Sequence, residues 1–118
     1  MATYKSISIT FGNALAQAQK LESSAEQMRN ASQRLEAVEE SLRSEWEGES
    51  ASLYLQKCDA LKQKLEKTAG DLVQIAAVIR KSAKSYRDAE IKALQQLQQR
   101  EKDDKTMVRY QMQDIAFR

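Results

Sequence analysis

Apolar residues recur at intervals of seven through the first half of this chain. The main row consists of Ala14, Leu21, Met28, Leu35 and Leu42. A companion row three positions later consists of Gln17, Ser24, Ala31 and Val38, and it is apolar only in its second half. Two such rows form one stripe on an α-helix, and charged residues such as Glu39 and Arg43 fill much of the other faces. The pattern predicts a helix over residues 11–43, with Thr10 or the competing Ser8 as its N-cap.

The second half of the chain repeats this spacing. Its main row consists of Cys58, Leu65, Leu72, Ile79, Tyr86 and Ala93, and its companion row of Tyr54, Leu61, Thr68, Ile75 and Ser82. The pattern predicts a second helix over residues 49–99. We expect one seam, within a hairpin or between two hairpins, to be formed by Leu21, Met28, Leu35, Leu42, Leu61, Leu65, Leu72, Ile75 and Ile79.

Trp46-Glu47-Gly48 separates the two stretches, in a chain with one Trp, three Gly and no Pro. Gly48 is suited to the left-handed backbone that ends a helix. Trp46 follows Leu42 by four positions, so its ring continues the apolar side into the bend. We therefore expect an extended lead-in over residues 1–9, a helical hairpin domain over 10–101 with its turn at 46–48, and a tail over 102–118. The tail is open to three interpretations: a frayed helix, a disordered segment or a short docking segment.

A two-helix hairpin leaves a second apolar strip partly uncovered. Its candidate residues are Phe11, Ala18, Ala25, Leu53, Val73, Ala76 and Ala83. Pairing with another hairpin is the simplest way to cover such a strip. The expected fold is therefore all-α: an antiparallel two-helix hairpin that dimerises into a four-helix bundle.

The composition argues against catalysis, metal binding and nucleic-acid binding. The 118 residues include 19 basic and 17 acidic residues, a near balance that gives no case for nucleic acid or an anionic membrane as partner. There is no His, and the lone Cys58 has no companion for a disulfide or a soft-metal site. We expect no cofactor and no enzyme activity, because no nucleophile, base and orienting group can be assembled. No apolar run of about 18 residues predicts a membrane helix, and MATYKSISIT lacks a signal-peptide core.

Two motifs together carry a family resemblance. The first is the turn, within SEWEGESASLYL; the second is Tyr86-x-x-x-Glu90, within LVQIAAVIRKSAKSYRDAE. With both motifs at this separation, residues 7–92 resemble the WXG family of small helical-hairpin proteins, the early-secreted-antigen-like substrates of type VII secretion. Family members commonly end soon after the second motif, whereas this chain continues for almost thirty residues.

The resemblance implies a non-enzymatic protein of a Gram-positive bacterium that leaves the cytoplasm without a cleaved signal peptide. It implies a homodimer, or a heterodimer with a related hairpin protein or a toxin N-terminal domain. Trp46 and Gly48 of one subunit, with Tyr86 and Glu90 of the other, would form a composite signal for the secretion ATPase. Spacing alone also allows a simpler interpretation, in which Tyr86 continues the apolar row and Glu90 is merely solvated.

Two other functions remain open. The chain is alternatively a targeting factor or chaperone for a larger LXG-type toxin, or a purely structural coiled-coil protein without an export role. Arg80, Lys84 and Arg87 share one helical face that could meet phosphate or an acidic partner, but a solvated face is the favoured interpretation, because Asp88 and Glu90 lie nearby in the sequence.

Overall fold

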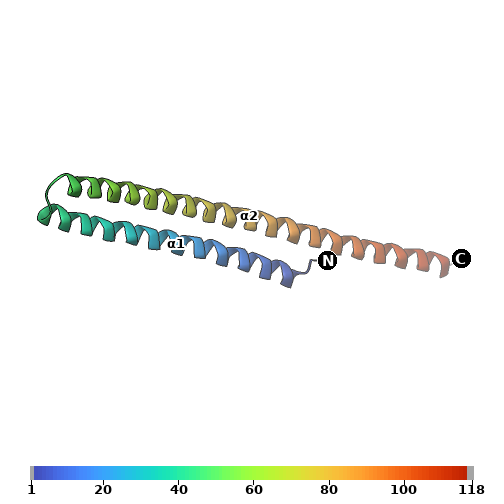
Figure 1. Ribbon diagram of the computed structural model, residues 1–118. Helices are drawn as coiled ribbons and strands as arrows, with labels where there is room; N and C mark the ends of the chain where they lie inside the picture. The colour runs from blue at the N-terminus through green and yellow to red at the C-terminus, as the bar shows by residue number, and fades with distance from the viewer. Residues whose placement is uncertain (1, 117–118) are drawn as a thin grey trace. The chain divides into compact units, whose positions relative to one another are not determined.

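The computed structural model describes the backbone of residues 2–116 and the side chains of residues 2–113 (Figure 1). Within this range, helix α1 spans Tyr4–Glu45 and helix α2 spans Glu49–Ala116. The predicted all-α two-helix hairpin is confirmed. By contact pattern the chain divides into two compact units: a turn unit of residues 14–81 and a terminal unit that joins residues 2–13 to residues 82–116.

Helix α1 begins earlier than the sequence pattern suggested. The Ser6 N–H donates to Thr3 Oγ1 at 3.1 Å, and the Thr3 N–H donates to Ser6 Oγ at 2.9 Å. This reciprocal pair caps the first turn in the manner of a capping box. The expected extended lead-in is therefore wrong over residues 4–9, and Thr10 and Ser8 lie inside the helix. Tyr4, Ile7 and Phe11 are spaced three and four apart, which is the spacing of one helical face and not the alternation of an extended segment.

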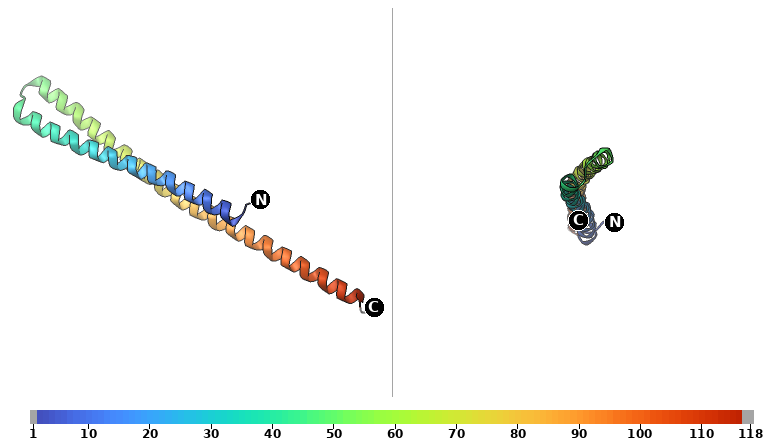
Figure 2. Two further views of the ribbon diagram at one scale, coloured as in Figure 1. Left: turned by 90° about the horizontal axis from the view of Figure 1, so that it is seen from below. Right: turned by 60° about the vertical axis from the view of Figure 1, so that its left-hand side comes forward.

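The turn unit is an antiparallel helical hairpin, with the end of α1 and the start of α2 side by side in both Figure 1 and Figure 2. Its buried positions are Ala18, Ala25, Ser32 and Glu39 on α1, and Ala51, Cys58, Ala69 and Ala76 on α2. Most of these side chains are small, so the two helix backbones can approach closely. The long side chains of the predicted main rows, such as Leu21 and Leu35, are half-buried on the flanks.

The predicted companion rows are displaced by one residue in both helices. On α2, Leu61 and Ile75 are 48% and 49% exposed, whereas the buried Ala69 and Ala76 belong to the adjacent row. Placing Ala18, Ala25 and Ala76 on an exposed strip was accordingly wrong, and Phe11 and Ala83 are half-buried. Leu53 and Val73, from the same predicted strip, are exposed.

In the terminal unit the first residues of α1 contact α2. Ile7 is buried, and the Tyr4 hydroxyl donates to Gln98 Oε1 at 3.2 Å. The Arg87 guanidinium carbon lies 4.2 Å from the centre of the Phe11 ring, a cation–π contact. From Gln98 to Gln113 all side chains are exposed. Residues 102–116, which the sequence left open, continue α2 as a helix.

Candidate functional site

Gly48 makes the turn possible. The Trp46 N–H still donates to the Leu42 carbonyl at 2.8 Å, which extends the α1 pattern by one residue beyond Glu45. Gly48 then has a φ of 113°, a value that side chains strongly disfavour. Its carbonyl accepts from the Ser52 N–H at 3.1 Å and so begins α2. The sequence-based expectation of a positive φ at Gly48 is confirmed.

The Trp46 ring packs on Tyr54 across the turn. Their ring centres are 5.8 Å apart and the planes are inclined by 52°, a favourable tilted arrangement. Both side chains nevertheless stay accessible, at 42% for Trp46 and 48% for Tyr54. The pair therefore closes the turn and presents an aromatic surface to solvent. Sequence reasoning placed Tyr54 in a packing row and did not predict this partnership.

Tyr86 and Glu90 belong to the terminal unit and differ in environment. Tyr86 is 60% exposed. Glu90 is half-buried and lines a small hollow of about 130 Å³ together with Ala2, Ala93, Leu94 and Leu97. The phenol is thus the accessible member of this motif. Trp46 and Gly48 lie in the turn unit, so the two motifs belong to different units of the chain.

Of the three basic residues predicted to share one helical face, Arg80 and Arg87 contact neighbouring side chains. In the turn unit Arg80 forms an ion pair with Glu22. In the terminal unit Arg87 stacks on Phe11 and lies 3.1 Å from Asp88 Oδ1. These contacts support the simpler interpretation of Arg80, Lys84 and Arg87 as part of a solvated, internally paired surface.

An ionic cluster around one buried carboxylate was not predicted. Glu39, which the sequence pattern places on a polar face, is fully buried. Its Oε2 lies 3.2 Å from Lys62 Nζ on α2 and 3.4 Å from Arg43 on its own helix. Lys62 also lies 3.4 Å from Asp59 Oδ1. Glu39 follows Ala18, Ala25 and Ser32 at intervals of seven. This spacing was the sequence signal that could have revealed its burial.

The cluster shifts two pKa values. Hydrogen bonding to Glu39 is the main cause that raises the pKa of Lys62 above its ordinary value, with Asp59 adding to it and desolvation opposing it. The pKa of Asp59 is lowered, first by its interaction with Glu39 and then by Lys62, against desolvation. Both shifts favour the charged forms of the residues on α2. The cluster therefore holds the two helices together electrostatically near the turn.

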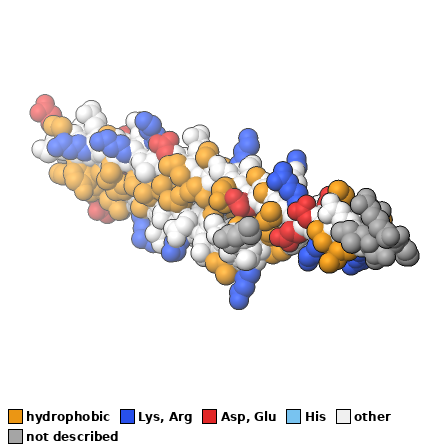
Figure 3. Space-filling model, turned by 90° about the vertical axis from the view of Figure 1, so that its right-hand side faces the viewer, with side chains coloured by type: hydrophobic (Ala, Val, Ile, Leu, Met, Phe, Trp, Pro, Cys, Tyr) orange, Lys and Arg blue, Asp and Glu red, His pale blue; other side chains and the backbone are white. Residues whose placement is uncertain are grey.

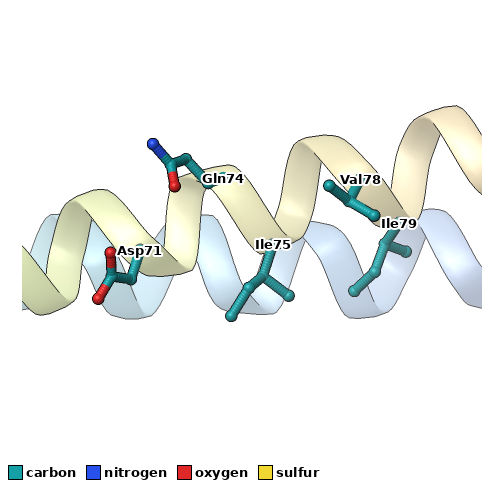
Figure 4. Close-up of a pocket in the computed structure, with 5 residues that line it drawn as sticks. All are labelled: Asp71, Gln74, Ile75, Val78 and Ile79. Carbon is teal, nitrogen blue, oxygen red and sulfur yellow. The ribbon is translucent and has the colours of Figure 1, made fainter.

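An apolar face of α2 remains uncovered in the turn unit. Asp71, Gln74, Ile75, Val78 and Ile79 line a shallow hollow of about 490 Å³ (Figure 4). Ile75 and Ile79 project to the same side of the helix in that view. Figure 3 shows hydrophobic side chains at the surface between charged ones. Whether Leu61 and Ile75 contact a second chain stays a prediction.

Two further features bear on function. Among the described residues, no group of three or more Cys, Asp or Glu side chains is arranged to hold a metal ion. No helix in the described part of the chain is long and apolar enough to cross a membrane. Cys58 is buried in the helix interface, as its position in the apolar row predicted.

Comparison with known proteins gives one result. Comparisons with the curated proteins and with the solved structures found no match. Residues 6–91 match the family WXG100, described as proteins of 100 residues with WXG. The match includes the turn motif, Tyr86 and Glu90, and the hairpin fold agrees with it. The chain therefore belongs to the WXG100 family, which is associated with type VII secretion.

Proposed function

We propose that this protein presents a two-part export signal to a type VII secretion ATPase, as a substrate or as the small partner of a larger cargo. Trp46 and Gly48 form one part, and Tyr86 and Glu90 the other. The exposure of both aromatic rings, 42% for Trp46 and 60% for Tyr86, carries the proposal. Large aromatic side chains that stay accessible at family motif positions favour recognition over core packing.

The proposal includes a second hairpin as partner. WXG100 proteins typically form helical-hairpin dimers. Leu61, Ile75 and Val78 leave an uncovered apolar face on α2, which the apolar face of another hairpin would bury. The partner is a second copy, a related hairpin protein or the helical N-terminal domain of a toxin. The Trp46 turn of one subunit and Tyr86 of the other then act as a single recognition surface.

One observation favours the alternative role of targeting factor for a larger toxin. Helix α2 continues beyond the matched residues 6–91, and its extension exposes Met107, Val108, Tyr110 and Met112. Val108 and Met112 line a hollow of about 440 Å³ with Asp104, Lys105 and Arg109. A helical segment of this kind suits contact with a cargo helix.

The experiment is an export assay in the source cell. The tagged protein is expressed in the parent strain and in a strain with the type VII ATPase gene deleted, and its secreted fraction is measured. We expect secretion only in the parent, with a cytoplasmic marker protein absent from both media. Secretion independent of the ATPase would contradict the proposal.

A further inference from the structure

Three glutamates lie within and next to the aromatic turn in the sequence. Glu45 ends α1, Glu47 lies within the turn and Glu49 begins α2. All three are exposed, and none takes part in an ion pair within the described residues. The nearest basic residue in sequence, Arg43, is engaged by the buried Glu39. The turn is therefore locally acidic in a chain whose total charge is close to neutral.

The position of Glu45 is informative. A carboxylate at the first turn of a helix, such as Glu49, is favoured by the helix dipole. At the last residue of a helix the same dipole opposes a negative charge. Glu45 therefore contradicts a local stability rule, and such contradictions concentrate at functional surfaces.

The glutamates alternate in sequence with an exposed aromatic residue, Trp46. The Trp46 and Tyr54 rings are in contact at 5.8 Å, and the neighbouring Leu53 is 57% exposed. We call this surface the turn patch, which consists of Glu45, Trp46, Glu47, Glu49, Leu53 and Tyr54. Exposed Trp and Tyr side chains are the residues that binding hot spots favour, and polar residues are typical of the margin of such an interface.

The negative charge of the turn patch indicates which kind of partner surface it fits. A second copy of the turn patch would place its glutamates against those of the first, which like-charge repulsion disfavours. An anionic surface is disfavoured for the same reason. We propose that the turn patch docks into a protein surface with an apolar pocket for Trp46 and Tyr54, ringed by lysine or arginine side chains that face Glu45, Glu47 and Glu49. The inference rests on the proposed function, which identifies the secretion ATPase as the candidate receptor.

The single Trp of the chain lies in the patch, so its fluorescence reports directly on docking. The full-length protein is titrated with the purified cytoplasmic domains of the ATPase. Trp46 emission is obtained by subtracting the fluorescence of the ATPase domains alone from that of the mixture. Acrylamide quenching of the bound state tests whether the ring is covered. We expect a blue shift, reduced quenching, and an affinity that falls about tenfold between roughly 50 and 500 mM salt, because salt screens charges at the rim.

Two triple variants separate the glutamates from the fold. Glu45→Gln/Glu47→Gln/Glu49→Gln removes the charges, and Glu45→Lys/Glu47→Lys/Glu49→Lys reverses them. We expect affinity to fall about tenfold in the first and further in the second, with most of the salt dependence lost in the first. The matched control is Glu26→Lys/Glu36→Lys/Glu66→Lys, which changes net charge as much as the reversal does, at exposed positions outside the patch. Circular dichroism checks that every variant remains helical.

Tyr54→Ala tests the aromatic part, with Tyr54→Phe as the conservative variant. Because the ring rather than the hydroxyl fills the pocket, we expect weaker binding for the first and near wild-type binding for the second. If the wild type binds and both glutamate variants bind equally well with unchanged salt dependence, the inference is overturned while the proposed function stands. Failure of the wild type to bind contradicts the inference and the proposed receptor together.

Discussion

At the residue scale, Glu39 is the most unusual side chain in the hairpin. It is the largest fully buried side chain of the described residues, in a row otherwise occupied by Ala and Ser. Lys62 and Arg43 both contact its Oε2, whereas Oε1 has no hydrogen-bond partner within the described residues. Burying a carboxylate is costly unless its charge is compensated, so Glu39 depends on these two cations.

We predict that the two partners of the interhelix pair respond unequally to substitution. Lys62→Met leaves Arg43 as the remaining cation beside the buried Glu39, so we expect this variant to lose stability. Glu39→Leu leaves Lys62 able to extend its ammonium group into water, so we expect a change within about 1 kcal/mol. The double variant should recover the stability lost in Lys62→Met. Urea unfolding of the four proteins measures this cycle, and equal losses in both single variants would contradict it.

Two glycines lead to a second residue-scale prediction. A Cβ added at Gly70 meets no atom within 4 Å among the described residues, so this helical glycine is not needed for close packing. Gly70→Ala should therefore stabilise the protein by about 1 kcal/mol through helix propensity. Gly48→Ala also has space but must adopt a φ of 113°, so it should destabilise by about 1–2 kcal/mol. Thermal unfolding compares the two, and the same sign for both would refute the argument.

At the element scale, sequence patterns predicted both helices and their turn. They did not predict which face of each helix packs against the other. The sequence pattern puts rows of Leu and Ile at the centre of the interface, with companion residues such as Leu61 and Ile75. The structure centres it on Ala25 and Ala76 instead, one position away from the companion rows. Small side chains allow the two helix backbones to approach closely. A hydrophobicity pattern does not identify such an interface, because it gives Leu and Ile more weight than Ala and Ser. The same one-position shift brings Glu39 from the expected polar face into the interface.

Local hydrogen bonding explains the other difference. Thr3 and Ser6 cap α1 through two reciprocal hydrogen bonds, and a Ser stands at the position where the usual capping signature has Glu or Gln. By contrast, the turn at Trp46 and Gly48 could be predicted from the sequence. Gly is the residue type that readily adopts a φ of 113°, and the chain has a single Trp. The exposure of Tyr54 beside Trp46 depends on how the two helices meet, which no single stretch of sequence specifies.

The extension of α2 leads to a prediction about local stability. Its side chains from Gln98 to Gln113 are exposed, so it lacks the packing that stabilises most protein helices. We expect amides of residues 102–113 to exchange with solvent at least about a hundredfold faster than those of residues 58–76. Hydrogen exchange of the purified protein measures both segments in one experiment. Equal protection would mean that a partner chain covers the extension.

At the scale of the whole molecule, the family assignment and the uncovered apolar face predict a dimer. Light scattering after size exclusion should give the mass of two chains at micromolar concentration, or of one chain with its related hairpin partner when both are present. Leu61→Lys/Ile75→Lys should shift the equilibrium to monomers, because each charge would be buried in the interface. Gln27→Lys/Gln63→Lys is the control with the same added charge at exposed polar positions outside the hollow lined by Ile75 and Val78. A monomer with every candidate partner would contradict the dimer.

The central claim is that two aromatic residues in separate units serve one export signal. The most direct measurement is the secreted fraction of the wild type, Trp46→Phe, Trp46→Ala, Tyr86→Phe and Tyr86→Ala in the source cell, with circular dichroism and light scattering of each purified protein. We predict that each alanine variant remains helical and dimeric inside the cell but is not secreted, and that the conservative variants retain more export. Normal secretion of both alanine variants would contradict the account.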